Sequence, residues 1–407
     1  MADRRLLHVL GGGPWQLPTV KRARELGYRV LVTDMYRERP AYALADLHEV
    51  VDITDLDATL AVARRYRVDG ILCDTTDVGV PTAAYVAERL GLPGMGYETA
   101  LNFTDKARMR ERTGRAGLRQ VRHDAVDSLS GLQAAAAQIG LPAVVKPVDS
   151  QSGRGVTIVL DSSTLETAWN FAVNHSRLRR VIVEQLVEGT EVIVDGLVVD
   201  GNVMLLTIAT KTPYADNPTI SSRICYLSGE HFERIRPILE PANRSVIAAL
   251  GLRTGIFHAE YMLSGGDVVP IDVAARGGGV TIYRHVLPHV SGVDAMSTVI
   301  RLAMGEPVRL QPSPIRRGAS IDFLRMPEGR LTRIEGAEAA AQEPGIAALH
   351  FNVGAGDTVG PLLHKDDRPG FIVALAETSD AAVDCAERAK AHLRVFMGST
   401  GDPVPVH

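Results

Sequence analysis

Residues Ala143–Val159 read AVVKPVDSQSGRGVTIV, two β-branched apolar runs that flank a polar segment with two glycines. The alternation of apolar residues on both sides predicts two strands. The segment between them, Ser150–Gly155, is too long for a tight hairpin turn and too polar for a buried core. Gly153 and Gly155 allow backbone conformations that turn N–H groups toward an anion. We therefore expect a mobile loop over phosphate groups, beside the cation of Lys146; an ordinary flexible hairpin loop is the alternative interpretation.

The composition is that of an ordinary globular protein. At 407 residues the chain is long enough for two or three domains. It has 44 basic and 48 acidic residues and no long basic run, so we expect no nucleic-acid partner. We also expect neither a signal peptide nor a membrane helix, which needs about 18–20 apolar residues. Three widely spaced cysteines predict reduced thiols in the cytoplasm, and neither a disulfide framework nor a zinc cluster.

The first hundred residues alternate between strand and helix patterns. Such alternation predicts a parallel sheet with helices on its faces. The predicted strands are 6–10, 29–34 and 70–74, and the predicted helices are 15–26, 56–66 and 81–90.

A glycine turn after the first predicted strand raises the question of a dinucleotide site. Gly11 and Gly13 match two positions of the G-x-G-x-x-G fingerprint, and Asp34 lies where a ribose-binding acid is expected. The third glycine is replaced by Gln16. We therefore favour a strand-to-helix turn that needs small residues, and keep NAD binding by an oxidoreductase as an alternative.

A strongly charged helix is predicted to begin after Thr104, which we take as its N-cap. Lys106 falls in its first turn, where the helix dipole disfavours a cation. This position suggests an anionic ligand nearby, and a solvated surface lysine is the alternative. Further helices are predicted at 128–139, 165–175, 234–250, 294–304 and 380–396, and strands at 181–184, 192–199, 203–211, 256–263 and 268–273. Residues 212–231 show no regular pattern, and the last ninety residues read as short strands and turns.

The predicted hairpin around Gly265–Asp267 carries two acids. With a three-residue loop, Ser264 faces Val268, and Glu260 faces Asp272. Like charges opposite each other are destabilising unless a cation lies between them, and oxygen ligands of this kind suit Mg²⁺ shared with phosphates. A two-residue loop would place the acids on opposite faces, and two unrelated surface acids are the alternative.

Three further groups have a chemical interpretation. Glu184 and Glu191 flank a turn that suits an adenine edge and ribose hydroxyls, although a solvated acidic turn explains them as well. Arg276 follows the Asp272 strand, where a permanent cation suits charge that develops on a transferring phosphoryl group. His285 and His289 lack a third metal ligand, so we favour surface or packed histidines.

In this order the motifs resemble the ATP-grasp superfamily, and within it carboxylate–amine ligases similar to bacterial L-amino acid ligases. The resemblance covers nearly the whole chain and includes Gly345-Ile-Ala and the stretch GAGDTV at 354–359. It implies a mixed α/β and α+β ATP-grasp fold in three parts: a parallel-sheet pre-grasp domain at 1–100, an ATP-grasp domain of two lobes at 101–315, and a C-terminal α+β subdomain at 316–407. It also implies that the glycine turn at Gly11 does not bind NAD.

The resemblance further implies a site for ATP and Mg²⁺, with Mn²⁺ as a possible substitute. Its residues fall into phosphate lysines, the glycine loop, the adenine hinge, the ribose acid, the metal ligands and the catalytic pair. The implied nucleotide-binding residues are Lys106, Lys146, Ser152, Gly153, Gly155, Glu184, Gln185, Leu186, Val187, Glu191 and Lys211; the metal ligands are Glu260 and Asp272; the catalytic residues are Arg276 and Lys146. Where the family has glutamate, any residue and asparagine, this chain reads Asp272-Val273-Ala274.

The implied reaction is activation of a carboxylate as an acyl phosphate, followed by attack of an amine, with release of ADP and phosphate. The partners are then small-molecule acid and amine substrates, and a homodimer is expected. A bicarbonate-using carboxylase and a nucleotide-binding protein without catalysis are the alternatives. The substrate pocket is expected along 212–231 and 276–289.

Overall fold

Four parallel strands form the N-terminal sheet of the computed structural model, which describes residues 4–279, 282–313, 315–398 and 403–406. The strand order is β3-β2-β1-β4, and the predicted parallel sheet is confirmed. All five residues of β1 are buried, as expected for a strand covered on both faces. The elements are β1 (Leu6–Leu10), α1 (Leu17–Glu25), β2 (Arg29–Asp34), β3 (Leu47–Val50), α2 (Leu56–Tyr66), β4 (Gly70–Leu72) and α3 (Val80–Leu90).

Two short helices follow, α4 (Tyr97–Thr104) and α5 (Lys106–Arg115). The predicted N-cap is wrong by one residue. Thr104 ends α4, and Asp105 caps α5, because its carboxylate accepts hydrogen bonds from the N–H groups of Ala107 and Arg108. Lys106 remains in the first turn of α5, as predicted.

A four-stranded antiparallel sheet forms what we call the small lobe. Its order is β5-β8-β6-β7, and β6 pairs with β7 from Ala143 opposite Val159. The predicted strand–loop–strand unit is therefore confirmed. Leu132 of α6 and Leu165 of α7 belong to the apolar core of this lobe. The elements are β5 (His123–Val126), α6 (Leu129–Ile139), β6 (Ala143–Pro147), β7 (Thr157–Val159), α7 (Leu165–Asn174) and β8 (Val181–Gln185).

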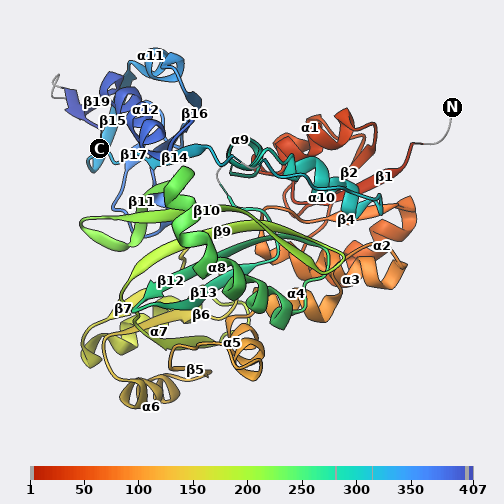
Figure 1. The fold of residues 1–407 in the computed structure, drawn as a ribbon, viewed down its shortest axis with the longest axis horizontal. Coiled ribbons are helices and arrows are strands. Elements are labelled where there is room, and N and C mark those ends of the chain that lie inside the picture. Colours follow the sequence, from red (N-terminus) through yellow and green to blue (C-terminus); the bar gives the residue numbers. More distant parts are fainter. Residues whose placement is uncertain (1–3, 280–281, 314, 399–402, 407) are drawn as a thin grey trace.

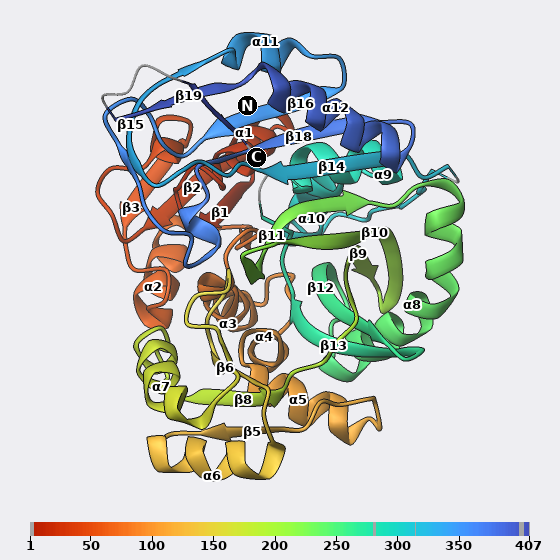
Figure 2. The same ribbon diagram turned by 90° about the vertical axis from the view of Figure 1, so that its left-hand side faces the viewer.

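An eight-stranded antiparallel sheet forms what we call the large lobe and continues into the C-terminal region (Figure 1). Its order is β13-β12-β9-β10-β11-β14-β18-β16. In Figure 2 the small lobe lies at the bottom, and the β12–β13 hairpin lies above it. The elements are β9 (Thr190–Val199), β10 (Asn202–Tyr214), β11 (Asn217–Tyr226), α8 (Gly229–Leu250), β12 (Gly255–Ser264), β13 (Asp267–Ala274), β14 (Gly318–Phe323), β16 (Ile346–Phe351) and β18 (Gly370–Ala376).

The irregular stretch predicted at 212–231 is wrong. Strand β10 runs on to Tyr214, and β11 begins at Asn217. The prediction took Pro213 and Pro218 as strand breakers. In the structure the pairing register shifts on either side of Pro213, and such irregularities accommodate a residue without an N–H group.

The C-terminal region adds a small sheet of order β17-β15-β19-β20. The predicted last helix is too long: α12 ends at His392, and β19 follows at once. The remaining elements are α9 (Leu287–Ser291), α10 (Ala295–Ala303), β15 (Gly329–Glu335), α11 (Ala337–Gln342), β17 (Thr358–Val359), α12 (Ser379–His392), β19 (Arg394–Met397) and β20 (Pro403–Pro405).

The largest apolar core crosses the boundaries between these parts. It contains Val9 of β1, Val299 of α10, Leu206 of β10 and Ile321 of β14. The N-terminal sheet, the large lobe and the C-terminal strands are therefore packed as one body. Within the described ranges, no helix is long and apolar enough to cross a membrane.

Candidate active site

The β12–β13 hairpin carries the two predicted metal ligands. Main-chain pairing places Glu260 opposite Asp272, as predicted, so both carboxylates belong to one face of the sheet. The predicted three-residue loop is wrong. Ser264 pairs with Asp267, which leaves the two-residue turn Gly265-Gly266.

A β-bulge reconciles this short turn with the observed pairing. Tyr261 pairs with Pro270 and the next pair is Glu260 with Asp272, so β13 has one residue, Ile271, more than β12 at this point. An extra residue moves every later side chain to the other face. The bulge, rather than the loop, therefore brings the two acids together.

Glu260 lies within a group of charges from the large lobe and the C-terminal region. Lys211 of β10 forms ion pairs with both Glu260, at 2.7 Å, and Glu191. Lys365 places its Nζ 3.9 Å from the Glu260 carboxylate. Burial alone would raise the pKa of Glu260, but Lys211 and Lys365 hold it well below its usual range. Glu191 is therefore part of a charge network and not a solvated acidic turn.

The facing side of the small lobe holds a second buried ion-pair network. Lys146 lies on β6 with its Nζ 2.7 Å from a carboxylate oxygen of Glu184 on β8. Arg110 of α5 donates to both oxygens of Glu184 and also to the main-chain carbonyl of Pro270 at the bulge. Burial opposes ionisation of Glu184, yet Arg110 and Lys146 lower its pKa. Arg110 thus links the small lobe to the hairpin that carries the acids.

Lys106 connects the glycine loop to the second acid. Its ammonium donates to the carbonyl of Ser150 at 2.9 Å and lies 3.3 Å from a carboxylate oxygen of Asp272. Burial alone would lower the pKa of Lys106, but Asp272 and Asp77 more than offset this effect and raise it. The structure therefore places both predicted phosphate lysines in ion pairs where the two lobes meet, Lys106 with Asp272 and Lys146 with Glu184.

The glycine loop adopts conformations that favour glycine. Ser152, Gly153 and Gly155 have φ angles of 61°, 75° and 77°. A Cβ on Gly155 would approach Pro147 to 2.7 Å, so a side chain does not fit there. The loop is thus shaped by positive φ angles and by close packing on the end of β6.

Both neighbouring parts of the chain contact this loop. The side chain of Gln151 accepts a hydrogen bond from the N–H of Asp77 at 2.8 Å and donates to the hydroxyl of Thr76. On the other side, Arg154 lies 3.4 Å from Asp366 of the C-terminal region. The loop therefore contacts both the N-terminal region and the C-terminal region.

Arg276 is held by the N-terminal region. Its guanidinium donates two hydrogen bonds to the carboxylate of Asp77, at 2.7 and 2.9 Å. The N–H of the next residue, Gly277, donates to the carbonyl of Asp74 at 2.8 Å. These contacts fix the orientation of Arg276 at the edge of the site.

The predicted adenine hinge lies at the end of β8, between the lobes. The N–H of Gln185 donates to the carbonyl of Arg122, and the N–H of Leu186 donates to that of Pro142. Val187 follows in the segment between β8 and β9, which has no regular secondary structure. Gln185, Leu186 and Val187 are partly exposed, whereas Glu184, the first residue of the predicted hinge, is buried.

A largely buried histidine lies beside Glu260 on the same face of β12, with its Nε2 3.8 Å from the Glu260 carboxylate. His258 is two residues before Glu260 on β12, and its Nδ1 is 2.7 Å from a carboxylate oxygen of Asp195. Asp195 also accepts a hydrogen bond from the hydroxyl of Thr207. A Cβ on Gly278 would approach both His258 and Asp195, so the triple-glycine segment packs closely over this pair.

Two alternatives from the sequence are resolved by geometry. The side chain of Gln16 lies against Gly11, with its Cδ 3.1 Å from where a Cβ would stand. Asp34 accepts a hydrogen bond from the N–H of Gly12 and forms an ion pair with Arg39. Both of its carboxylate oxygens therefore already have partners within the protein. Gln16 and Arg39 therefore pack against the glycines of this turn. His289 bonds to the carbonyl of Ala376, away from any predicted ligand.

The acids on the hairpin fit a magnesium ion shared with phosphates. Among the described residues, no three His, Cys, Asp or Glu side chains are gathered so as to hold a metal by themselves. Glu260 and Asp272 offer hard carboxylate oxygens, and each is balanced by a lysine cation. Mg²⁺ commonly uses one or two carboxylates together with phosphate oxygens and water. Ala274 on the same strand offers no further ligand.

Sequence reasoning missed five residues of this site: Asp77, Arg110, Asp195, His258 and Lys365. Each meets its partner across a long sequence separation, and Arg276 and Asp77 are 199 positions apart. One local signal was present, because Arg110 and Lys106 are one helical turn apart on α5. The structure describes the expected pocket segment 276–289 except for residues 280–281, which lie outside the described ranges.

Three family models match the chain. Residues 20–94 match an ATP-grasp N-terminal domain, residues 139–284 an ATP-grasp domain, and residues 322–398 an L-amino acid ligase C-terminal domain 2. Together they follow the order expected from the sequence.

Proteins of known sequence and structure are similar over most of the chain. A formate-dependent phosphoribosylglycinamide formyltransferase from Chlorobaculum tepidum is 28% identical over 84% of this chain and 86% of its own. An L-amino acid ligase from Bacillus licheniformis superposes with a TM-score of 0.81 at 21% identity, covering 98% of this chain and 100% of that one. A phosphoribosylglycinamide synthetase from Anaerococcus prevotii gives 0.76 at 21% identity, covering 97% and 100%. The predicted fold is confirmed by these superpositions.

Proposed function

The chain is an ATP-grasp protein of the carboxylate–amine ligase kind, and on that premise we propose that the cleft between its two lobes joins an acid to an amine. The observation that carries the proposal is the convergence of charges on the cleft. Lys106 and Lys146 approach it from one side, and the carboxylates of Glu260 and Asp272 from the other. Opposed cations and acids of this kind suit the terminal phosphates of ATP and their metal ion.

The proposed reaction has two steps. A carboxylate oxygen of the acid attacks the γ-phosphorus of ATP, the bond to the β-phosphate oxygen breaks, and acyl phosphate and ADP form. The amine nitrogen then attacks the acyl carbon, phosphate leaves, and the amine loses a proton. Mg²⁺, when bound, neutralises phosphate charge and orients the phosphates.

The proposed roles of the residues follow from their positions. Lys106 and Lys146 bind phosphate oxygens, and the loop of Ser152, Gly153 and Gly155 excludes water above them. Arg276, oriented by Asp77, stabilises the charge of the acyl phosphate and of the tetrahedral intermediate. Residues 185–187 receive the adenine edge, and Glu191 with Lys211 lies where the ribose is expected. Glu184 forms an ion pair with Lys146 and belongs to the site through that contact.

We also propose the division 1–100, 101–315 and 316–407, a homodimer and a cytoplasmic location. The three free cysteines support a reducing compartment. Light scattering after gel filtration tests the oligomeric state.

A phosphate-release screen tests the function. ATP, Mg²⁺ and pairs of a carboxylate and an amine are mixed with the protein, and the nucleotide product is identified by chromatography. The acids include amino acids, bicarbonate and formate, the acid in the name of the formyltransferase relatives. ADP with phosphate, formed only when both substrates are present, supports the ligase. AMP with pyrophosphate contradicts the proposed acyl phosphate intermediate. Turnover with bicarbonate as the one accepted acid identifies the carboxylase alternative.

A further inference from the structure

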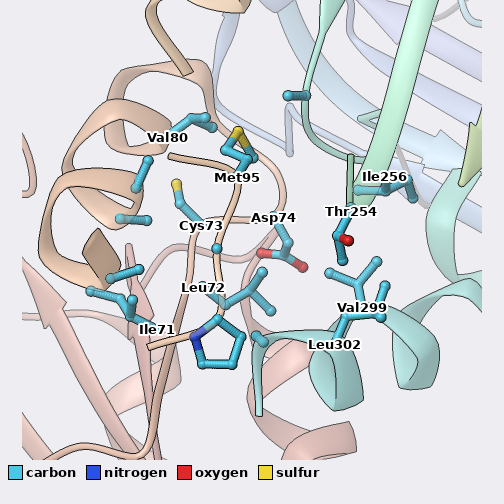
Figure 3. A pocket seen from close by; sticks show the side chains of 18 residues that line it. Ile71, Leu72, Cys73, Asp74, Val80, Met95, Thr254, Ile256, Val299 and Leu302 are labelled. Atoms are coloured by element: carbon cyan, nitrogen blue, oxygen red, sulfur yellow. The ribbon is translucent and has the colours of Figure 1, made fainter. Parts of the chain in front are cut away.

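A cavity of about 80 Å³ lies beside the candidate active site, between the N-terminal sheet and the large lobe. Its walls come from six places: the end of β4, helix α3, the segment 93–95, the start of β12, Ala275 after β13, and helix α10. Figure 3 shows Ile71, Val80, Ile256 and Val299 among the apolar side chains that surround it. Apart from the thiol of Cys73, Asp74 and Thr254 contribute the only polar side chains among the described residues of the wall.

Asp74 is fully buried at this wall. Its Oδ2 accepts a hydrogen bond from the hydroxyl of Thr19, while its Oδ1 has no hydrogen-bond partner in the described part of the chain. In Figure 3 its carboxylate lies among the cavity side chains, between Leu72 and Thr254. Burial raises the pKa of Asp74 to about 6, with the Thr19 hydrogen bond opposing the shift.

An unpaired carboxylate oxygen in an apolar wall is costly, and buried polar atoms are nearly always hydrogen-bonded. A donor that enters the cavity can supply this partner. A cationic donor forms a stronger hydrogen bond to a carboxylate than a neutral one does. The surrounding aliphatic side chains favour an alkyl group on that donor.

The volume limits the size of this ligand. A cavity of ~150 Å³ holds a benzene molecule, and this cavity is about half as large. A group of roughly four non-hydrogen atoms fits such a space. A short alkylammonium combines this size with the required charge.

We propose that this cavity is a binding site for a small primary alkylammonium ion. The ammonium donates to Oδ1 of Asp74, and the alkyl chain packs against Val80 and Val299. The site is distinct from the nucleotide cleft. It adjoins that cleft, because the carbonyl of Asp74 accepts a hydrogen bond from Gly277, the residue after Arg276.

Calorimetric titration of the full chain with n-propylammonium chloride, without nucleotide, tests this proposal. The neutral alcohol 1-propanol, which has the same number of non-hydrogen atoms, is the matched probe. The wild type should bind n-propylammonium at least about tenfold more tightly than 1-propanol. Asp74→Asn should remove this preference, Ala83→Leu should fill the cavity and abolish binding of both probes, and the exposed-site control Asp124→Asn should change neither.

Several outcomes would overturn the site. The proposal is contradicted if n-propylammonium does not bind. It is also contradicted if the wild type binds the alcohol equally tightly, or if folded Asp74→Asn keeps full binding of n-propylammonium. Either of these two results indicates a cavity that holds water or any small solute. If thermal melting shows that Asp74→Asn does not fold, Ala83→Leu decides, because it keeps the carboxylate and must still lose the ammonium. The titration contains no ATP, so a failed ligase assay and a failed titration are separate results.

Discussion

Arg276 and Asp77 form a two-point ion pair, with Nε 2.7 Å from Oδ1 and Nη2 2.9 Å from Oδ2. The two residues come from different parts of the fold, Arg276 from the segment after β13 and Asp77 from the loop after β4. Two parallel hydrogen bonds hold a guanidinium in one plane. The N-terminal sheet thereby sets the direction of a cation in the proposed catalytic site.

Arg276→Ala should lower turnover by roughly 10²–10³-fold, as the loss of one preorganised donor commonly does. ATP binding should stay largely intact, because the proposed role concerns the acyl phosphate. Steady-state kinetics and calorimetry with an ATP analogue measure the two effects. A large loss of ATP affinity with normal turnover would contradict the role.

Asp77→Asn should lower turnover by roughly tenfold, because the guanidinium loses one charged acceptor but keeps its own charge. The expected signature is a fall in kcat with little change in the KM for ATP. In an Arg276→Ala background the same change should have a smaller effect, because the pair is then already broken and only the charge of Asp77 near Lys106 is lost. Additive effects in this double-mutant cycle would show that Asp77 acts independently of Arg276.

Lys146→Ala should weaken ATP binding, because its ammonium lies in the cleft and is expected to contact phosphate in the ground state. Calorimetry with a non-hydrolysable ATP analogue and Mg²⁺ measures the affinity. Lys21 is exposed on α1, and Lys21→Ala is a matched control for the loss of one cation. Equal affinities of the wild type and Lys146→Ala would remove Lys146 from the phosphate site.

Ala274→Asn should lower the Mg²⁺ concentration at half-maximal activity. The bulge at Ile271 precedes Asp272, so residues 272 and 274 keep a common face of β13, and an asparagine oxygen at 274 is directed as Asp272 is. A titration of activity with free Mg²⁺ at saturating ATP gives the shift. Asp272→Ala should abolish metal-dependent ATP binding. An unmoved curve for Ala274→Asn would show that residue 274 does not reach the metal.

Hydrogen exchange in residues 150–155 should slow when an ATP analogue and Mg²⁺ bind, because the loop is then held from both sides. Gln151→Ala should speed exchange in the free protein, since Gln151 contacts Asp77 and Thr76. Loop 265–266, which is distant from these contacts, is the internal control. Unchanged exchange in the presence of nucleotide would contradict a lid.

The buried Glu184 should make stability depend on pH. Its pKa is lowered from the ordinary 4.5 by Arg110 and Lys146. A lowered native-state pKa stabilises the fold above the unfolded value, and this stabilisation is lost as the pH falls through the native value. Urea unfolding of wild type and Glu184→Gln should therefore differ most near neutral pH and converge in acid. A difference that grows in acid would contradict the shift.

Much of this protein could be predicted from sequence because the decisive signals are local. The alternation in Ala143–Val159 determines a strand, a loop and a strand, whatever surrounds them. The strand and helix patterns of the first hundred residues are of the same kind, and they predicted a parallel sheet that the structure confirms. The predicted pairing of Glu260 with Asp272 is also correct.

The pairing of Glu260 with Asp272 was predicted correctly from an incorrect loop length, so local signals did not determine it. The turn is one residue shorter than expected, and a bulge next to Pro270 compensates. A bulge depends on what the strand contacts, and here Arg110 of α5 binds the carbonyls of Pro270 and Ile271. Within the hairpin Pro270 favours an edge strand or a bulge, but it does not determine where the extra residue lies.

The tertiary structure alone decided which residues complete the site. Asp77, Arg110 and Lys365 reach Arg276, Glu184 and Glu260 from other parts of the fold. The sequence determines periodicity, turns and caps, because these depend on neighbours a few positions apart. Ion pairs between distant segments depend instead on how sheets and helices pack, and that packing is set by the shape of the whole apolar core.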